Sequence, residues 1–349
     1  MKIAITADVH LSSYKETPER YHALRDILQQ AVSASLDAVL ICGDLFHQNF
    51  NNYKDFEKLA KDFQKMKIWI LPGNHDARVS SRSLMGKNLR IFEKAEIVGE
   101  DILFLMVPYQ AGTTMGDVIA GQVKSLSPKN WVLCGHGDWL EGVRMPNPME
   151  SGTYMPLTRT DLERYMPLHV FLGHIHAKLD GPVCYAGSPC GIDITETGER
   201  RFLVFDTSTG EVESKPVNTD LVYQNANLLI LPVEDEIAYI RKLISEEKLA
   251  WKIRSEKDIA RTTIRVKVRG YTRDKTALND LVLQEFEGFS YYKDEGPDLS
   301  EVSVVWDQSR IKIAELVKER IKNLELNPSP DEPDRDLILM KSLSLVFED

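Results

Sequence analysis

The sequence has no long hydrophobic run. Its longest apolar stretches fall far short of the roughly 18 residues that a transmembrane helix needs, so we expect no membrane association. Asp8 interrupts the first apolar run and no cleavage site of small residues follows, which argues against a signal peptide. No internal repeat or low-complexity tract is visible. The 349 residues are therefore expected to form two globular domains, or one with appendages.

Cysteine is scarce and is not arranged as a metal site. The four cysteines, Cys42, Cys134, Cys184 and Cys190, form no C-x-x-C pair, which excludes the usual thiolate zinc sites. Cys42 and Cys134 lie inside apolar stretches, two residues before candidate metal ligands, so we interpret them as buried reduced thiols. Reduced cysteines are typical of the cytoplasm, and we predict a cytoplasmic protein.

Basic residues are fewer than acidic residues over the whole chain, with 43 Lys or Arg against 53 Asp or Glu. The formal net charge of −10 disfavours a general affinity for nucleic acid. The distribution is uneven, because residues 248–275 contain ten Lys or Arg against three acids, whereas the last 27 residues contain seven acids and two bases. The average therefore hides one basic region.

Five short apolar runs, typical of buried strands, each lead into residues that can bind metal ions or transfer protons. A single histidine at such a place is more often structural, but six of the eight histidines fall inside these short motifs. The motif residues are, in chain order, Asp8, His10, Asp44, His47, Asn74, His75, Asp76, His136, His174 and His176.

Carboxylate, imidazole and amide ligands gathered at strand ends are what a phosphoester hydrolase with two metal ions needs. Asp8 and His10 are alternate residues, which a regular strand would point apart, but both can turn to one ion where the chain bends. Asp44 is the natural bridge, because a carboxylate has two ligating oxygens. Asn74 adds an amide oxygen without charge, and His75 is placed for proton transfer or charge stabilisation. This ligand set favours two divalent ions, manganese (Mn²⁺) first, with Mg²⁺, Fe²⁺ or Zn²⁺ as alternatives.

The character of the chain changes twice along its length. Strand-like runs alternate with helical patterns over residues 1–217, which predicts an α/β fold of two packed sheets with helices outside. Residues 222–307 predict a small α+β module. Residues 308–349 predict a helix, a proline-rich linker from Asn327 to Pro333 and a final apolar segment.

Two segments of the first part are less regular. Residues 80–94 are predicted to be mostly helical. Residues 140–160 are rich in Pro, Gly and Met without a clear period, which predicts a long loop. This loop either lies beside the metal site or is a surface excursion without a role.

The motifs D-x-H, G-D, G-N-H-D, H and G-H-x-H together resemble those of the calcineurin-type metallophosphoesterase superfamily. The stretch from Gly43 to His47 and the sequence Gly187-Ser188-Pro189 resemble, more narrowly, double-strand-break repair nucleases of the SbcD type and their meiotic-recombination relatives. The resemblance covers residues 1 to about 206 and fades beyond them. It implies a four-layer sandwich of two mixed sheets flanked by helices, with a small α+β capping domain.

The same resemblance implies a role for each motif residue. It places Asp8, His10, Asp44 and His176 on one ion, and Asp44, Asn74, His136 and His174 on the other. His75 would act at the transition state or on the leaving group, and His47 would orient the scissile phosphate. Ser12 and Ser13 stand where the family usually has glycine, so the resemblance does not give the shape of that loop. Gly137 and Asp138 follow His136 where relatives often have a second histidine or another polar residue, so contacts behind the ligands are not carried over.

The basic region contains a strand-like stretch, residues 262–269, in which Arg265, Lys267 and Arg269 alternate with β-branched residues. Period-two spacing places the three cations on one face. They are either charges that guard a solvated edge strand or a surface that follows DNA phosphates. The resemblance favours DNA contact, because relatives carry a capping domain here that touches the duplex.

The resemblance also implies partners. Relatives bind an SMC-like coiled-coil ATPase through C-terminal helices, although such a helix can also fold back on its own domain. Relatives dimerise through helices that correspond to residues 53–66 and 80–94, where Phe56, Phe63 and Phe92 serve either a homodimer contact or the core.

We therefore predict a metal-dependent DNA nuclease of double-strand-break repair, with exonuclease or endonuclease preference and polarity left open. Another metallophosphoesterase, acting on small molecules, cyclic nucleotides or phosphoproteins, explains the metal residues equally well. A metal-bound scaffold without activity is the third possibility, and the complete ligand set disfavours it.

Overall fold

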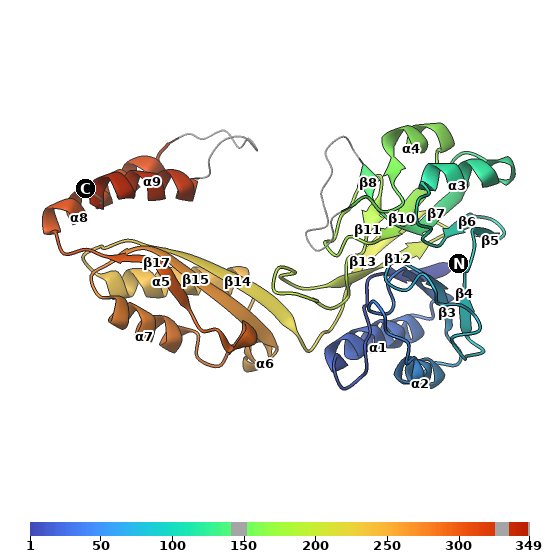
Figure 1. Ribbon diagram of the computed structural model, residues 1–349, viewed down its shortest axis with the longest axis horizontal. Coiled ribbons are helices and arrows are strands. Elements are labelled where there is room, and N and C mark those ends of the chain that lie inside the picture. Colours follow the sequence, from blue (N-terminus) through green and yellow to red (C-terminus); the bar gives the residue numbers. More distant parts are fainter. Residues whose placement is uncertain (141–151, 325–334, 348–349) are drawn as a thin grey trace. The chain divides into compact units, whose positions relative to one another are not determined.

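The computed structural model describes residues 1–140, 152–324 and 335–347. Its elements fall into two units, Met1–Val222 and Tyr223–Asp349 (Figure 1). The two C-terminal helices, one before and one after the proline-rich stretch, belong to the second unit. The linker predicted from Asn327 to Pro333 lies outside the described residues. No described helix is long and apolar enough to cross a bilayer.

The first sheet of the first unit has the strand order β13-β12-β1-β2-β3-β4. Its four strands from β1 to β4 run parallel, and β12 and β13 run antiparallel as a hairpin beside β1. The strands are β1 (Lys2–Thr6), β2 (Ala38–Cys42), β3 (Lys67–Leu71), β4 (Leu89–Ile91), β12 (Arg201–Asp206) and β13 (Glu211–Pro216).

The second sheet has the order β11-β10-β7-β6-β5, and only β5 runs antiparallel to its neighbour. Two further short strands, β8 (Trp139–Leu140) and β9 (Leu157–Thr158), pair with each other as a separate two-stranded sheet. The strands of the sheet are β5 (Glu96–Val98), β6 (Leu103–Val107), β7 (Trp131–His136), β10 (His169–Gly173) and β11 (Cys184–Tyr185).

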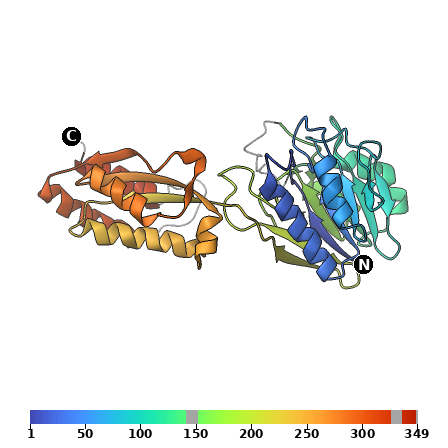
Figure 2. The same cartoon turned by 90° about the horizontal axis from the view of Figure 1, so that it is seen from below.

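Helices cover the outer faces of both sheets. α1 (Pro18–Ser33) and α2 (Lys54–Asp62) pack side by side on the first sheet (Figure 2). α3 (Met115–Gln122), the short η1 (Val123–Ser125) and α4 (Arg159–Tyr165) follow the strands of the second sheet, and α3 and α4 pack on it. This arrangement confirms the predicted four-layer sandwich.

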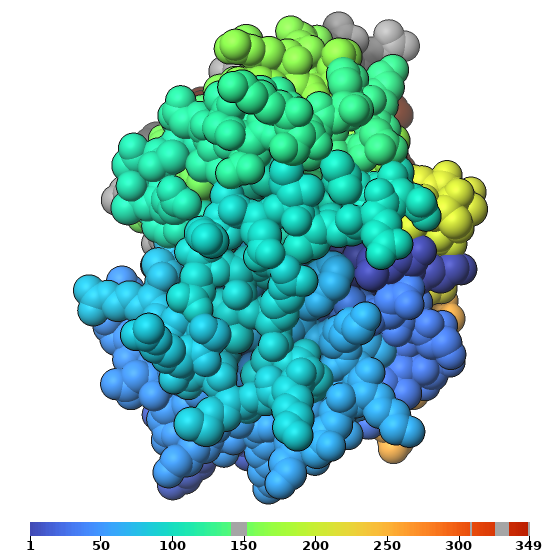
Figure 3. Space-filling model, turned by 90° about the vertical axis from the view of Figure 1, so that its right-hand side faces the viewer, coloured from blue at the N-terminus to red at the C-terminus, as the bar shows by residue number. Residues whose placement is uncertain are grey.

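The central strands are buried on both faces, which explains their unbroken apolar sequences. In β1, Ile3 and Ile5 face the second sheet, while Ala4 faces the helices. Figure 3 shows one face of this unit, where the residues around β3 to β6 (cyan) lie between those of α1 and α2 (blue) and the later elements (green). Phe56 and Phe92 are fully buried, so both serve the core.

The prediction of a mostly helical segment over residues 80–94 is wrong. These residues form turns and the short strand β4, which pairs with β3 in the register Ile68↔Leu89. The Asn88 side-chain amide donates to the carbonyls of Ala60, Phe63 and Met66 and so satisfies groups at the end of α2. A helix here would remove Asn88 from those carbonyls. Of the loop predicted over 140–160, residues 141–151 lie outside the described part and 157–165 form β9 and α4.

The second unit is a sheet with helices on both faces. β15 (Thr262–Thr272) lies between β14 (Val222–Ile230) and β16 (Ser290–Tyr291), and β17 (Asp298–Val304) also pairs with it. The buried side chains of β15 pack against α5 (Glu236–Ala250) and α7 (Lys275–Glu285). The remaining elements are α6 (Glu256–Ala260) and η2 (Tyr292–Asp294). The alternative of a guarded edge strand is thus wrong, because β15 is an inner strand.

Two helices complete the second unit. α8 (Gln308–Lys322) and α9 (Arg335–Phe347) pack together and onto Leu229 and Tyr271 of the sheet. The rings of Tyr271 and Phe347 lie 4.6 Å apart. The C-terminal segment therefore folds back on its own unit, as one of the two alternatives predicted.

Candidate metal centre

The candidate ligands leave their strands at one end of the two sheets. β1 and β2 run parallel, and their pairing continues past the last strand residues through Asp8 N to Gly43 O (3.1 Å) and His10 N to Asp44 O (2.9 Å). In the second sheet, Gly137 N donates to Gly173 O (3.1 Å) beyond the ends of β7 and β10. Because parallel strands end at the same edge, ligands from distant segments meet there.

Four of these residues have left-handed backbones. The φ angles are 54° for Asp8, 50° for His10, 49° for Asp44 and 98° for His174. Non-glycine residues in this region carry strain of order 1–3 kcal/mol each, which is typical of functional sites. The bends turn Asp8 and His10 toward the same place, which is the departure from strand geometry that the sequence required.

The side chains form a continuous group of nitrogen and oxygen atoms. Asp44 Oδ2 lies 3.7 Å from His10 Nε2 and 3.3 Å from His136 Nε2. Asn74 Oδ1 lies 2.7 Å from His136 Nε2 and 3.2 Å from His174 Nδ1. Asp8 and His176 lie close to His10 in the same cluster. All seven predicted ligands are thus brought together, with Asp44 in the middle.

The candidate ligands include two groups of three residues, and within each group the ligand atoms lie within 4.8 Å of one another. The first group is Asp8, His10 and His176, and the second is Asp8, Asp44 and His136. His10 Nε2 faces His176 Nε2 at 3.2 Å, an arrangement of two imidazole nitrogens that a shared cation would satisfy. Asp8 belongs to both groups, and its carboxylate also accepts from the backbone N of His174 at 2.9 Å.

The residues present fit divalent cations. Within the part of the chain that the structure describes, the buried Nδ1 of His10 has no hydrogen-bond partner. The Asp8 and Asp44 carboxylates are almost fully buried, at 0% and 1% exposure, and their ion-pair distances are to imidazoles. Buried carboxylates need a cation or a proton to balance their charge.

The pKa values report the same need for positive charge. Burial raises the pKa of Asp8 to about 6. Burial alone would lower the pKa of His136, but the charge and hydrogen bond of Asp44 raise it to about 10. Burial alone would raise the pKa of Asp44, but His136 and His10 hold it below its ordinary value. A proton on His136 therefore balances Asp44 where a metal ion otherwise would.

Glycines allow the ligands to approach. A Cβ on Gly43, whose φ is +90°, would lie 1.9 Å from His136 Nδ1. A Cβ on Gly73 would lie 2.1 Å from Asp44 Oδ1. Asp76 braces the same loop by accepting from Gly73 N (2.6 Å) and Phe46 N (3.1 Å). Burial, with the neighbouring Asp44, raises the pKa of Asp76 to about 7.

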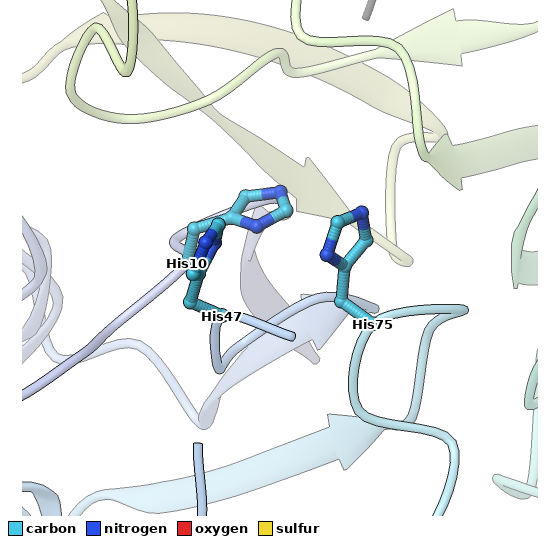
Figure 4. Close-up of side chains that lie close together, drawn as sticks. All are labelled: His10, His47 and His75. Carbon is cyan, nitrogen blue, oxygen red and sulfur yellow. The ribbon is translucent and has the colours of Figure 1, made fainter. Parts of the chain in front are cut away.

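His47 and His75 lie beside the ligands and form a cluster with His10 (Figure 4). The His10 ring centroid is 4.7 Å from that of His75 and 5.9 Å from that of His47. His47 is exposed and His75 is half-buried, so both can be reached by a substrate. Partial desolvation by its neighbours and the nearby Arg20 charge lower the pKa of His47, which favours a neutral ring. The backbone N of His75 donates to Asp44 Oδ1 at 2.9 Å.

No sequence motif marks Glu196, Arg20 or Tyr154, yet each contacts a candidate ligand. Glu196 accepts from His176 Nδ1 at 2.7 Å, Arg20 Nη1 donates to His10 O at 2.7 Å, and the Tyr154 ring lies 4.7 Å from that of His174. No local pattern in the sequence indicates any of these three contacts, because each joins segments that meet only in the fold.

The three predicted DNA-binding cations lie in the second unit on the β15 face that points away from α5 and α7. Each is paired with an acid. Arg265 Nε lies 2.7 Å from Glu295, Lys267 Nζ lies 2.5 Å from Glu301, and Arg269 Nη2 lies 3.7 Å from Asp336 of α9. The charge of this face is therefore largely balanced within the unit, which sequence spacing could not reveal.

Comparison with known proteins gives a family match. A model described as calcineurin-like phosphoesterase matches residues 1–195. The uncharacterized metallophosphoesterase YhaO of Bacillus subtilis (strain 168) is 24% identical over 282 residues, which cover 68% of this chain and 67% of that protein.

Two solved structures resemble the chain weakly. An archaeal phosphodiesterase has 18% identity and a TM-score of 0.34, and the match covers 62% of this chain and 100% of that one. The Pseudomonas putida nuclease MPE has 13% identity and a TM-score of 0.27, with 61% and 87% covered. The residues matched by the family model include every candidate ligand and end one residue before Glu196.

Proposed function

Because this chain belongs to the calcineurin-like phosphoesterase family, we propose that it is a two-metal phosphodiesterase whose substrate is DNA. Membership makes the chain a metal-dependent phosphoesterase hydrolase. The observation that carries the proposal is the convergence of seven ligands with His47 and His75 beside them. Manganese is the proposed metal, because oxygen and imidazole ligands without thiolates suit it.

The chain's own residues have separate tasks in this proposal. Two bound ions would polarise the phosphate and activate the attacking water. Asp8, His10, Asp44 and His176 would hold one ion, and Asp44, Asn74, His136 and His174 the other. His75 donates a proton to the leaving sugar oxygen. His47, exposed at the edge of the cluster, orients the scissile phosphate.

DNA contact is proposed for Arg265, Lys267 and Arg269, which share one face of β15. Their acidic partners must give way to phosphates, because a cation that keeps its carboxylate partner releases no counterion from DNA. Since exposed ion pairs contribute little, about 0–1 kcal/mol each, such an exchange is feasible.

The decisive experiment is manganese-dependent digestion of duplex DNA ends. We expect activity in the wild-type chain and a loss of about 10²- to 10⁴-fold in His75→Ala, the range for a group that transfers a proton in the transition state. His75→Ala should still bind both ions, since His75 is not among the proposed ligands. A wild-type chain as inert as His75→Ala would end the nuclease proposal.

The paired cations of β15 favour a second candidate, a phosphodiesterase for small molecules or cyclic nucleotides. Replacing Arg265, Lys267 and Arg269 with alanine separates the two. On the nuclease proposal, DNA cleavage falls while hydrolysis of a small chromogenic diester survives. Equal DNA cleavage by the variant and the wild type would favour the second candidate.

We also propose a role in double-strand-break repair, as exonuclease or endonuclease, with an SMC-like ATPase and a second copy of this chain as partners. Exposed apolar side chains on the C-terminal helices support a partner surface, with Leu316 69% and Leu345 86% exposed. Purification from the native source should recover a coiled-coil ATPase, and Leu316→Glu should lose it. Sedimentation of the purified chain as a monomer would contradict the homodimer.

A further inference from the structure

A loop behind His176 holds a buried carboxylate against the ring. Glu196 follows β11 in the chain, and its Oε1 accepts from His176 Nδ1 at 2.7 Å. The two side chains are 10% and 14% exposed, so water competes little for this hydrogen bond. The opposite ring nitrogen, His176 Nε2, is the atom that faces His10 Nε2 at 3.2 Å.

We propose that Glu196 is a positioning residue that fixes the tautomer and the direction of the His176 ring, so that Nε2 presents its lone pair to a metal ion. This inference rests on the proposed two-metal function. Glu196 itself is not a ligand, because its two oxygens face His176 Nδ1 and the groups behind it.

The tautomer follows from hydrogen-bond chemistry. An ionised carboxylate only accepts hydrogen bonds, so Nδ1 must carry the hydrogen when it faces Glu196. A neutral imidazole has one N–H, and Nε2 is then left with the lone pair that a metal ion needs. Carboxylate partners of this kind commonly orient metal-binding histidines and fix their tautomer.

Glu196 is held in place on its far side. Its Oε2 accepts from Ser188 Oγ (2.6 Å), Arg200 Nη2 (2.9 Å) and the backbone N of Ile192 (3.2 Å). Arg200 also donates to the backbone carbonyls of His176 and Ser188, both at 2.9 Å. The same guanidinium therefore anchors the backbone and, through Glu196, the ring of His176.

Arg200 also balances the charge of Glu196. The two charged groups lie 2.9 Å apart and each side chain is 10% exposed. The carboxylate therefore orients the His176 ring without adding net negative charge beside the ions. This separates Glu196 from Asp8 and Asp44, for which cationic side-chain partners are imidazoles.

Glu196→Gln tests the proposal. A glutamine that keeps its oxygen toward His176 turns its NH₂ group toward three donors, and one that reverses faces Nδ1 with a donor and favours the wrong tautomer. We expect one of the two ions to bind about 10- to 100-fold more weakly, while the other is retained. Ion affinity is measured by calorimetry with Mn²⁺, and Co²⁺ absorption reports the change in coordination.

Asp180→Asn is the matched control. Asp180 forms a two-point pair with Arg201 (2.9 and 2.7 Å) in the same stretch of chain, and neither residue is a candidate ligand. We expect Asp180→Asn to lower the free energy of unfolding and to leave ion affinity unchanged. Ser188→Ala, which removes one hydrogen bond behind Glu196, should weaken the same ion by a smaller factor and guards against misfolding of Glu196→Gln.

The outcomes are distinguishable. If Glu196→Gln and Ser188→Ala bind both ions as the wild type does, the positioning role is refuted. Equal weakening in Asp180→Asn would also refute it, because the effect would then be one of general stability. A wild-type chain that binds two ions but cuts no DNA would remove the proposed substrate, while the ion affinities of the variants would still decide the role of Glu196.

Discussion

Removing the acidic partners of the β15 cations should strengthen DNA binding. The triple variant Glu295→Gln, Glu301→Gln and Asp336→Asn leaves the three cations in place but frees them from their carboxylates. The side chains of these pairs are 32–54% exposed, and ion pairs in contact with solvent stabilise proteins by only about 0.2–1 kcal/mol each. The variant should therefore remain folded.

The size of the effect follows from counterion release. Each phosphate neutralised by a cation adds about 0.9 to the slope of log affinity against log salt concentration. Three freed cations would steepen that slope by up to about 2.7. A fourfold rise in salt would then weaken the variant about 40-fold more than it weakens the wild type.

The assay is fluorescence anisotropy of a labelled duplex at several salt concentrations. A control variant, Glu246→Gln, Asp280→Asn and Glu287→Gln, removes the same charge from α5, from α7 and from the residue that follows Phe286. Its slope should stay near that of the wild type, because these acids do not pair with β15. Equal slopes in both triple variants would refute the assignment of this face to DNA.

Three further predictions concern the first unit. Asp44→Ala should leave less than one bound ion per chain, since its carboxylate faces histidines of both candidate groups; near-full occupancy by metal analysis would contradict the bridging role. Gly73→Ala should weaken ion binding, because its Cβ would lie 2.1 Å from Asp44 Oδ1. The control is Gly121→Ala in α3, whose Cβ would meet no atom within 4 Å and which should raise the free energy of unfolding by up to about 1 kcal/mol in denaturant titrations. Burial raises the pKa of Cys190 to about 12, so the thiol stays protonated below that pH and should resist alkylation near the ordinary thiol value of about 8.5; rapid labelling of the folded chain by mass spectrometry would refute this.

The positions of the candidate ligands at the strand ends could be predicted from sequence because they depend on local patterns. Buried parallel strands have unbroken apolar sequences, and polar residues such as Asp44 and His136 begin where each run ends. The periodicity does not give the strand order. Which ligands share an ion therefore came from the family resemblance and not from spacing.

Other features depend on contacts between distant segments and left no local signal. The residues around Asn88 have a helical pattern, but the Asn88 amide is needed at the end of α2. The cations of β15 alternate as on an edge strand, yet their partners come from segments as distant as α9. Glu196 lies 20 positions after His176, with β11 between them in the chain, and no spacing rule predicts their contact.

The charge of the candidate ligands bears on the substrate. Asp8 and Asp44 are the carboxylates of the two ion groups, and the other proposed ligands are imidazoles and the Asn74 amide, which are neutral when they ligate. Two divalent cations would carry more charge than the two carboxylates that ligate them, so the ions with their ligands would be net positive and would attract an anionic phosphodiester. Glu196 does not change this balance, because Arg200 pairs with it. The use of neutral ligands around Asp44, the proposed bridge, is therefore consistent with a site that leaves positive charge for a phosphate.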